Sequence, residues 1–451
     1  MPESAGNVRF RRRRGGSSAG RARVGSGKWR HFDGVANGRR VAGAGVGMLL
    51  MKTRRVLNAG AFLMFALTTP ESTNKHAAPP QMELKTYALY GGPNAADLSP
   101  DERVAATEIT RRVTANDPET KDVEEIVELW DFKSDKMTAE VRLMTTNVRE
   151  KTKGYVPDPN RSNRVVRFSP DGTKVVALVA SRIFVLDATK VDVVREIALE
   201  TSGNASPPHE PLFRTMEISP DGEKIAVATM VGDLRGRIDI YSLDSGKRVE
   251  GWEVSEGWAG LGSSPVWSTD SKTIVVAAPG TSPCGAPNGL PDIFAFDSET
   301  GTITGRWTSG MLVGSVAASG DGRLFAVDRN CLGVFRNHDP KLKVIDVATG
   351  NIRDEISGRG DGVRYMVALS GDGKRLLAFT GKIEMQFDWG DAVPRDRVVD
   401  ETFSVWDSKS YAGLATSQNI PGLMRATVRL SSHGRYTIVC GRANAAVYEL
   451  P

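Results

Sequence analysis

Apolar and polar positions repeat along most of this chain in one short phrase: an apolar run, a tight polar turn, and a second apolar run. The phrase occurs seven times, and the serines that open its turns lie 70, 50, 49, 51, 51 and 61 residues apart. A period near 50 residues indicates a repeat fold in which each unit buries its faces against its neighbours. The seven turns are Ser99–Glu102, Ser169–Gly172, Ser219–Gly222, Ser268–Ser271, Ser319–Gly322, Ser370–Gly373 and Ser431–Gly434.

The turns read Ser-Pro-Asp-Gly or a variant of it, and each residue type has a conformational reason to be there. Proline presets φ at the second position, Asp suits the third, and Gly accepts a positive φ at the fourth. The flanking runs, such as residues 174–179, are short and rich in β-branched residues, which is the pattern of strands. We therefore predict hairpins whose turn residues are structural and not catalytic.

A third apolar run follows in the first six units and ends in an apolar residue plus Asp, before a second turn and a fourth run. Four short strands per unit is the composition of a β-propeller blade. The sequence therefore predicts an all-β fold, a seven-bladed β-propeller. The predicted strand ends are Leu129-Trp130-Asp131, Val185-Leu186-Asp187, Ser242-Leu243-Asp244, Ala295-Phe296-Asp297, Val344-Ile345-Asp346 and Val405-Trp406-Asp407.

On these residues the chain resembles the WD40-like β-propellers, in their bacterial form with Ser-Pro-Asp-Gly turns. The resemblance covers roughly residues 82–450, and two units carry a literal Trp-Asp, at 130–131 and 406–407. The Gly-His dipeptide of typical WD40 units is absent, and the last unit has Glu449 where the others have Asp. The resemblance therefore implies the fold, and it does not imply the Asp–His–Ser/Thr–Trp network of typical members.

The seventh unit has only three strands before the chain stops, while the residues before the first turn contain a spare one, 82–90. We predict that this N-terminal strand is the outermost strand of the last blade. Such closure removes an exposed edge from the ring. Residues 82–451 would then form one propeller domain.

The basic charge of the chain is concentrated at its N-terminus. The formal net charge is +5, but residues 1–55 alone carry +12, which leaves −7 for the remainder. A mildly acidic propeller does not favour nucleic acid as a partner. Residues 1–47, rich in Gly, Arg and Ser, are expected to be a disordered extension, upstream of a true start at Met48 or Met51.

Residues 48–70 have the pattern of an export signal: a basic start, a twelve-residue apolar stretch at 56–67 and a polar exit. The stretch is too short to span a bilayer comfortably, so no transmembrane span is expected in the mature chain. Residues 71–81 read as a linker. We expect export to the periplasm, the cell surface or the medium; an uncleaved N-terminal membrane anchor and a mitochondrial transit peptide are the alternatives.

The chain has three cysteines. Cys440 ends a predicted second strand and is expected to be a buried core thiol. Cys284 and Cys331 lie in long loops of consecutive blades on one face, where an oxidising compartment would allow them to pair. Two free thiols are the alternative. Their spacing does not indicate a metal site.

Insertions fall in two classes of loop that share one face of a propeller. Between second and third strands they occupy about residues 110–124, 279–291, 328–340 and 381–399, and between blades about 145–163 and 199–212. Loops on a rigid scaffold are where binding residues concentrate, and aromatic and arginine side chains are typical anchors. The candidate binding residues on this face are Phe387, Asp388, Trp389, Asp391, Arg329, Arg336 and His338.

The propeller region shows no phosphate-binding loop, His-Glu-x-x-His or Cys-x-x-Cys motif. We therefore predict a non-catalytic, exported propeller that binds a protein or other ligand through its loop-elaborated face, with no cofactor, no metal and no catalytic residues assigned. Two alternatives remain open. One is a propeller enzyme of lactonase or quinoprotein type with a site at the channel mouth, and the other is a structural subunit of a cell-envelope complex.

Overall fold

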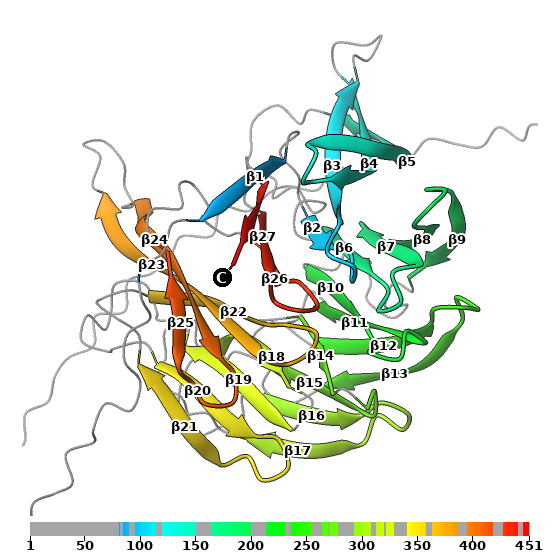
Figure 1. The fold of residues 1–451 in the computed structure, drawn as a ribbon. Helices are drawn as coiled ribbons and strands as arrows, with labels where there is room; N and C mark the ends of the chain where they lie inside the picture. Colours follow the sequence, from blue (N-terminus) through cyan, green and yellow to red (C-terminus); the bar gives the residue numbers. More distant parts are fainter. Residues whose placement is uncertain are drawn as a thin grey trace, which may run out of the picture. The chain divides into compact units, whose positions relative to one another are not determined.

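In the computed structural model the chain folds into seven antiparallel sheets of four strands each, arranged in a ring, and the described part contains no helix (Figure 1). This confirms the predicted all-β, seven-bladed β-propeller. The structure describes residues 81, 84–89, 95–113, 120–149, 164–199, 213–230, 236–254, 264–268, 270–277, 293–307, 313–319, 322–328, 341–357, 363–386, 395–417, 427–440 and 445–450.

The blades are numbered in chain order, and strands run from the inner edge of each blade outward. Blade 1 holds β2 (Ala95–Leu98), β3 (Val104–Val113), β4 (Thr120–Asp131) and β5 (Lys136–Arg149); blade 2 holds β6 (Arg164–Phe168), β7 (Lys174–Val179), β8 (Arg182–Asp187) and β9 (Val193–Ala198); blade 3 holds β10 (Phe213–Ile218), β11 (Lys224–Met230), β12 (Gly236–Ser242) and β13 (Arg248–Val254). Blade 4 holds β14 (Val266–Trp267), β15 (Thr273–Ala277), β16 (Ile293–Asp297) and β17 (Ile303–Trp307); blade 5 holds β18 (Val313–Ala318), β19 (Arg323–Asp328), β20 (Lys341–Asp346) and β21 (Ile352–Ser357); blade 6 holds β22 (Val363–Leu369), β23 (Arg375–Gln386), β24 (Arg395–Asp407) and β25 (Gly413–Thr416). Blade 7 holds β26 (Thr427–Leu430), β27 (Tyr436–Cys440), β28 (Ala445–Glu449) and, from the other end of the propeller, β1 (Lys85–Leu89).

The ring closes through β1, as the sequence predicts. β1 pairs with β28 along its whole length, from Lys85 opposite Glu449 to Leu89 opposite Ala445. The Tyr87 hydroxyl also donates a hydrogen bond to Glu449 at 3.0 Å. Leu89 is the only fully buried side chain of this strand, so β1 is held mainly by backbone pairing.

The hairpin turns have the structural role that their composition predicts. In blade 2 the Ser169 hydroxyl donates to Asp171 at 2.5 Å and accepts the Lys174 N–H at 2.9 Å, and Gly172 has a φ of 71°. The hydrogen bond from Ser169 lowers the pKa of Asp171. The same serine-to-aspartate bond recurs in the turns that open at Ser99, Ser219, Ser268 and Ser370.

Two turns have no glycine at the fourth position, and their side chains bond to the preceding blade. Glu102 has a φ of 58°, and its carboxylate accepts the Ser431 hydroxyl at 2.6 Å and the His433 N–H at 3.0 Å, both in blade 7. Ser271 has a φ of 59° and accepts the Asp221 N–H of blade 3 at 3.1 Å. A left-handed conformation costs a non-glycine residue about 1–2 kcal/mol, which these inter-blade bonds offset.

The aspartate after the third strand caps the turn that follows it. Asp187 accepts the N–H groups of Thr189 and Lys190, both at 2.9 Å, and the hydroxyl of Thr189 helps to lower the pKa of Asp187 to about 2. Equivalent turn caps are made by Asp131, Asp297, Asp346 and Asp407.

The assignment of Asp244 to this position is wrong. Lys224 pairs with Ser242, as Lys174 pairs with Asp187 in the blade before, so Ser242 has the capping place and accepts the Ser245 N–H at 3.1 Å. Asp244 lies two residues further on, with its side chain 84% exposed, and pairs with Lys174 of blade 2 at 2.6 Å.

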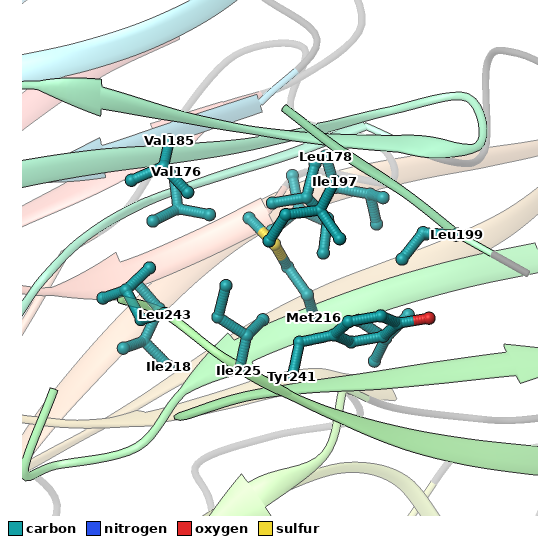
Figure 2. Packing of buried hydrophobic residues seen from close by; sticks show 13 residues of the cluster. Val176, Leu178, Val185, Ile197, Leu199, Met216, Ile218, Ile225, Tyr241 and Leu243 are labelled. Atoms are coloured by element: carbon teal, nitrogen blue, oxygen red, sulfur yellow. The ribbon is translucent and has the colours of Figure 1, made fainter. Parts of the chain in front are cut away.

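The core lies between adjacent sheets and not inside any one of them. Between blades 2 and 3, side chains of β7, β8 and β9 meet those of β10, β11 and β12, as Figure 2 shows for Leu178 and Ile197 beside Met216 and Tyr241. Because successive strand residues point to opposite faces, neighbouring residues of the same strands, such as Ala177, pack against blade 1.

A β-bulge recurs near the start of the fourth strand in blades 1 to 6. In each of them the pairing with the third strand shifts by one residue just before the aspartate or serine cap. The β1–β28 pair of blade 7 has no such shift. The extra residues of the six bulges are Thr138, Val194, Val249, Thr304, Arg353 and Leu414.

Gly301 shows how closely the turns of one blade approach the outer strand of the blade before. It has a φ of 66°, and a Cβ there would lie 2.7 Å from the indole of Trp252 on β13. Gly322 has a φ of 79°, but a Cβ there would meet nothing within 4 Å.

We therefore expect Gly301→Ala to destabilise the protein more than Gly322→Ala in urea unfolding. Both substitutions impose a left-handed conformation on alanine, at about 1–2 kcal/mol. Only the first adds overpacking against Trp252, at a further ~1–3 kcal/mol. Equal losses in the free energy of unfolding of the two variants would contradict the close packing of Gly301 against the Trp252 indole.

Candidate functional site

The binding residues that the sequence nominates lie outside the described residues. This holds for Arg329, Arg336, His338, Phe387, Asp388, Trp389 and Asp391, and for the two cysteines of the candidate disulfide, Cys284 and Cys331. Cys440 is described, and it is the buried core thiol that the sequence predicts. Burial raises the pKa of the Cys440 thiol to about 12, with Glu108 contributing, so the thiol stays protonated.

Two of the expected insertions are largely β-structure and not loop. Residues 110–113 continue β3, and residues 120–124 begin β4. In blade 6, β23 runs to Gln386 and β24 starts at Arg395, within the expected loop 381–399. Part of this face is therefore built from long β-ribbons, which hold a defined shape by backbone pairing.

The longest of these ribbons extends blade 1. The inner strand β2 pairs with β3 only up to Glu108, opposite Ala95. Beyond that point three strands continue together, and Figure 1 shows β3 and β4 running on well beyond the short strand β2. We call this extension the blade-1 arm; it consists of residues 109–113, 120–126 and 142–149.

Charged side chains form pairs on and beside the arm. Arg111 makes two hydrogen bonds to Glu140, at 3.0 and 2.7 Å, and Arg142 donates to Glu124 at 2.9 Å. The hydrogen bond to Glu140 raises the pKa of Arg111, and the bond from Arg111 lowers the pKa of Glu140. The arginine side chains are 46% and 65% exposed. Exposed pairs of this kind add little stability and are accessible to a partner.

The arm is fixed to blade 2 at its base by buried charges. Arg164, with a side chain 5% exposed, donates to Glu125 at 2.6 Å and lies 3.4 Å from Glu108. Burial opposes ionisation of Glu125, but the hydrogen bond and charge of Arg164, together with hydrogen bonds to Glu108 and Thr110, hold its pKa below the ordinary value. Breaking a buried ion pair by removing one partner costs about 3–5 kcal/mol, so the direction of the arm is firmly set.

A second group of charges lies in the central channel. Two positions before the serine that opens each hairpin turn, blades 7, 1, 2 and 3 carry a charged residue, in alternating sign around the ring. Blades 4, 5 and 6 carry Val266, Ala317 and Ala368 there. We call the charged residues the channel quartet: Arg429, Asp97, Arg167 and Glu217.

Glu217 is the hub of the channel quartet. It accepts a hydrogen bond from Arg167 of the adjacent blade at 3.0 Å and a close hydrogen bond from Arg429 of blade 7. Asp97 accepts the backbone N–H of Phe168 at 2.9 Å and interacts electrostatically with Arg167. The side chains of Glu217 and Arg429 are 21% and 26% exposed, so water in the channel reaches both.

Burial in the channel shifts the titration of both carboxylates. It raises the pKa of Glu217 to about 7, against the attraction of Arg167 and with a contribution from the Asp97 carboxylate. Burial also raises the pKa of Asp97, again against Arg167. A carboxyl group that titrates near neutrality could exchange a proton, and this one lies within hydrogen-bond distance of two guanidinium groups.

Sequence reasoning missed the channel quartet, although a signal for it exists. Aligning the units on their turn serines places Asp97, Arg167, Glu217 and Arg429 in one column. Within the described residues, no three side chains of His, Cys, Asp or Glu gather in a way that could hold a metal ion. In the same part of the chain, no helix has the length and apolar character needed to cross a bilayer.

No protein-family model matches the chain, and no curated protein is similar to it in sequence. Among solved structures, the hydrazine synthase of Kuenenia stuttgartiensis is similar with 17% identity and a TM-score of 0.46, over 65% of this chain and 76% of that chain. A chain in a crystal structure of the mitotic checkpoint complex is similar with 13% identity and a TM-score of 0.48, over 88% of this chain and 99% of that chain. These similarities carry no information about activity or partner.

The pKa of Glu217 predicts a specific dependence of stability on pH. Its value in the folded protein lies above its ordinary 4.5, so between about pH 4.5 and 7 the folded state binds more protons than the unfolded state. Stability from this group is therefore present at low pH and is lost as the pH rises through this window, with a slope of at most about 1.4 kcal/mol per pH unit.

We expect urea unfolding at pH 5, 6, 7 and 8 to show a decline in the stability of the wild type relative to Glu217→Gln. Glu140→Gln serves as the control, because the pKa of Glu140 is lowered, so its linkage cannot make stability fall as the pH rises. If the free energy of unfolding of the wild type, relative to Glu217→Gln, stays constant or rises with pH, the two arginines keep Glu217 ionised throughout.

Proposed function

We propose that this protein is a non-catalytic, exported propeller of the bacterial WD40-like type that binds a protein partner through its elaborated face. The blade-1 arm is the observation that supports this proposal most directly. It is a pre-formed, three-stranded projection with exposed charged side chains, and it is held at a fixed angle by the buried Arg164 cluster. A rigid projection binds without a large ordering cost.

The opposite face has far fewer polar groups available to bind a partner. Its hairpin turns are short, and their polar groups are already used in bonds within the turn or to the next turn, as in Asp372 N–H to the Ser432 carbonyl at 2.8 Å. In the proposed interface the nominated residues Arg329, Arg336, His338, Phe387, Asp388, Trp389 and Asp391 supplement the arm. A Cys284–Cys331 disulfide would brace the loops between them.

A charge reversal tests the role of the arm. A photoreactive amino acid placed at position 142 in the native host is expected to crosslink to one discrete partner. The same amino acid at position 194, on the outer strand of blade 2, is not.

With that partner purified, we expect Arg142→Glu to weaken binding by tenfold or more. Lys247→Glu, the matched reversal of an exposed basic residue in a turn of the opposite face, is expected to change it less than twofold. Equal effects of the two reversals would exclude the arm as the interface.

Export is a separate part of the proposal, supported by the basic and apolar pattern of residues 48–70. The native protein is expected in the exported fraction with its mature N-terminus between about residues 68 and 80. N-terminal peptide mapping of fractionated cells measures this. A chain starting at Met1 in the cytosol would refute export without affecting the binding proposal.

A further inference from the structure

The contact between Arg429 and Glu217 connects parts of the ring that no strand pairing connects. The two residues are 212 positions apart in sequence and lie on β26 of blade 7 and β10 of blade 3. Two blades separate them one way around the ring and three blades the other way. Their hydrogen bond therefore crosses the central channel, whereas the bonds of Arg167 to Glu217 and of Phe168 to Asp97 join adjacent blades.

We propose that the channel quartet is a latch that holds blade 7 closed, by tying its inner strand to the opposite wall of the ring. Strand β1 is the outer half of the same closure. In this arrangement the docking of blade 7 depends on Glu217, a residue of blade 3. Loss of the Arg429–Glu217 contact loosens the β1–β28 pairing, and loss of that pairing loosens the contact.

Blade 7 is where such a latch is needed. It is the one blade assembled from both ends of the propeller, and its outer strand β1 buries a single side chain. The turn of blade 7 is tied to blade 1 through Glu102, and Arg429 is the tie that reaches across to blade 3.

The chemistry of the quartet favours cooperative behaviour. Removing one member of a group of poorly solvated charges leaves its partner uncompensated, which costs more than the pair itself contributes. The corresponding positions of blades 4, 5 and 6 hold Val266, Ala317 and Ala368, which are apolar and cannot take over an interaction with Arg429. The alternation of sign also means that every member has an opposite charge beside it.

Hydrogen exchange measured by mass spectrometry on the whole protein tests the latch. We expect Arg429→Gln to speed amide exchange in β26–β28 and β1 tenfold or more, with little change in blades 4 and 5. Glu217→Gln is expected to produce the same increase in blade 7, although it lies in blade 3. The double variant is expected to exchange no faster than the faster-exchanging single variant, because both substitutions remove the same Arg429–Glu217 interaction.

The control is Lys174→Gln, which removes the exposed pair with Asp244 between blades 2 and 3; it is expected to leave exchange in blade 7 unchanged. An effect of Glu217→Gln confined to blades 2 and 3, or additive effects in the double variant, would overturn the proposal.

A second measurement needs no substitution and covers the case in which the variants do not fold. Because Glu217 and Arg429 are partly exposed to the channel, salt weakens their attraction. Between 0.05 and 1 M NaCl at pH 8, above the pKa of Glu217, we expect exchange in blade 7 and β1 of the wild type to rise by a larger factor than in blades 4 and 5. The same factor in all of them would show that no ionic latch holds blade 7.

Discussion

Each sheet of this ring has two apolar faces, and only the adjacent sheets can cover them. In blade 2, Leu178 packs toward blade 3 while Ala177, the next residue, packs toward blade 1. A blade therefore has no core of its own, and an open end would leave a complete apolar face in water. The requirement that the last blade meets the first explains why a strand from the N-terminal side of the propeller completes blade 7.

Charged residues are placed where apolar packing cannot define geometry. Between the sheets almost any close-packed apolar surface would hold two blades together, but it would not set the direction of a projection or the diameter of the channel. Arg164 with its two glutamates fixes the angle of the blade-1 arm, and the channel quartet spans the centre of the ring. Buried charges are expensive to separate, so each cluster permits essentially one arrangement.

The sequence predicts the blades, the turns and the closing strand, because the residues that decide each turn and each strand lie within a few positions of one another. Ser169 and Asp171 define their turn by themselves. The sequence predicts a loop where the arm lies, because its strand ends, such as 120–124, are rich in charged residues that have low strand propensity in isolation. Pairing with β3 and β5 decides their conformation. Arg429 and Glu217 could not be paired from sequence, because only the closed ring brings them together.

The bulges on the fourth strands have a consequence for how copies of this protein meet. A bulge bends an edge and interrupts the row of N–H and carbonyl groups that another strand would need for continuous pairing. Blades 1 to 6 have this interruption near the start of their outer strands, and β1 does not. The rim thus has one straight edge, so association of two rings by strand addition, and the aggregation that follows from it, would be directed to a single blade.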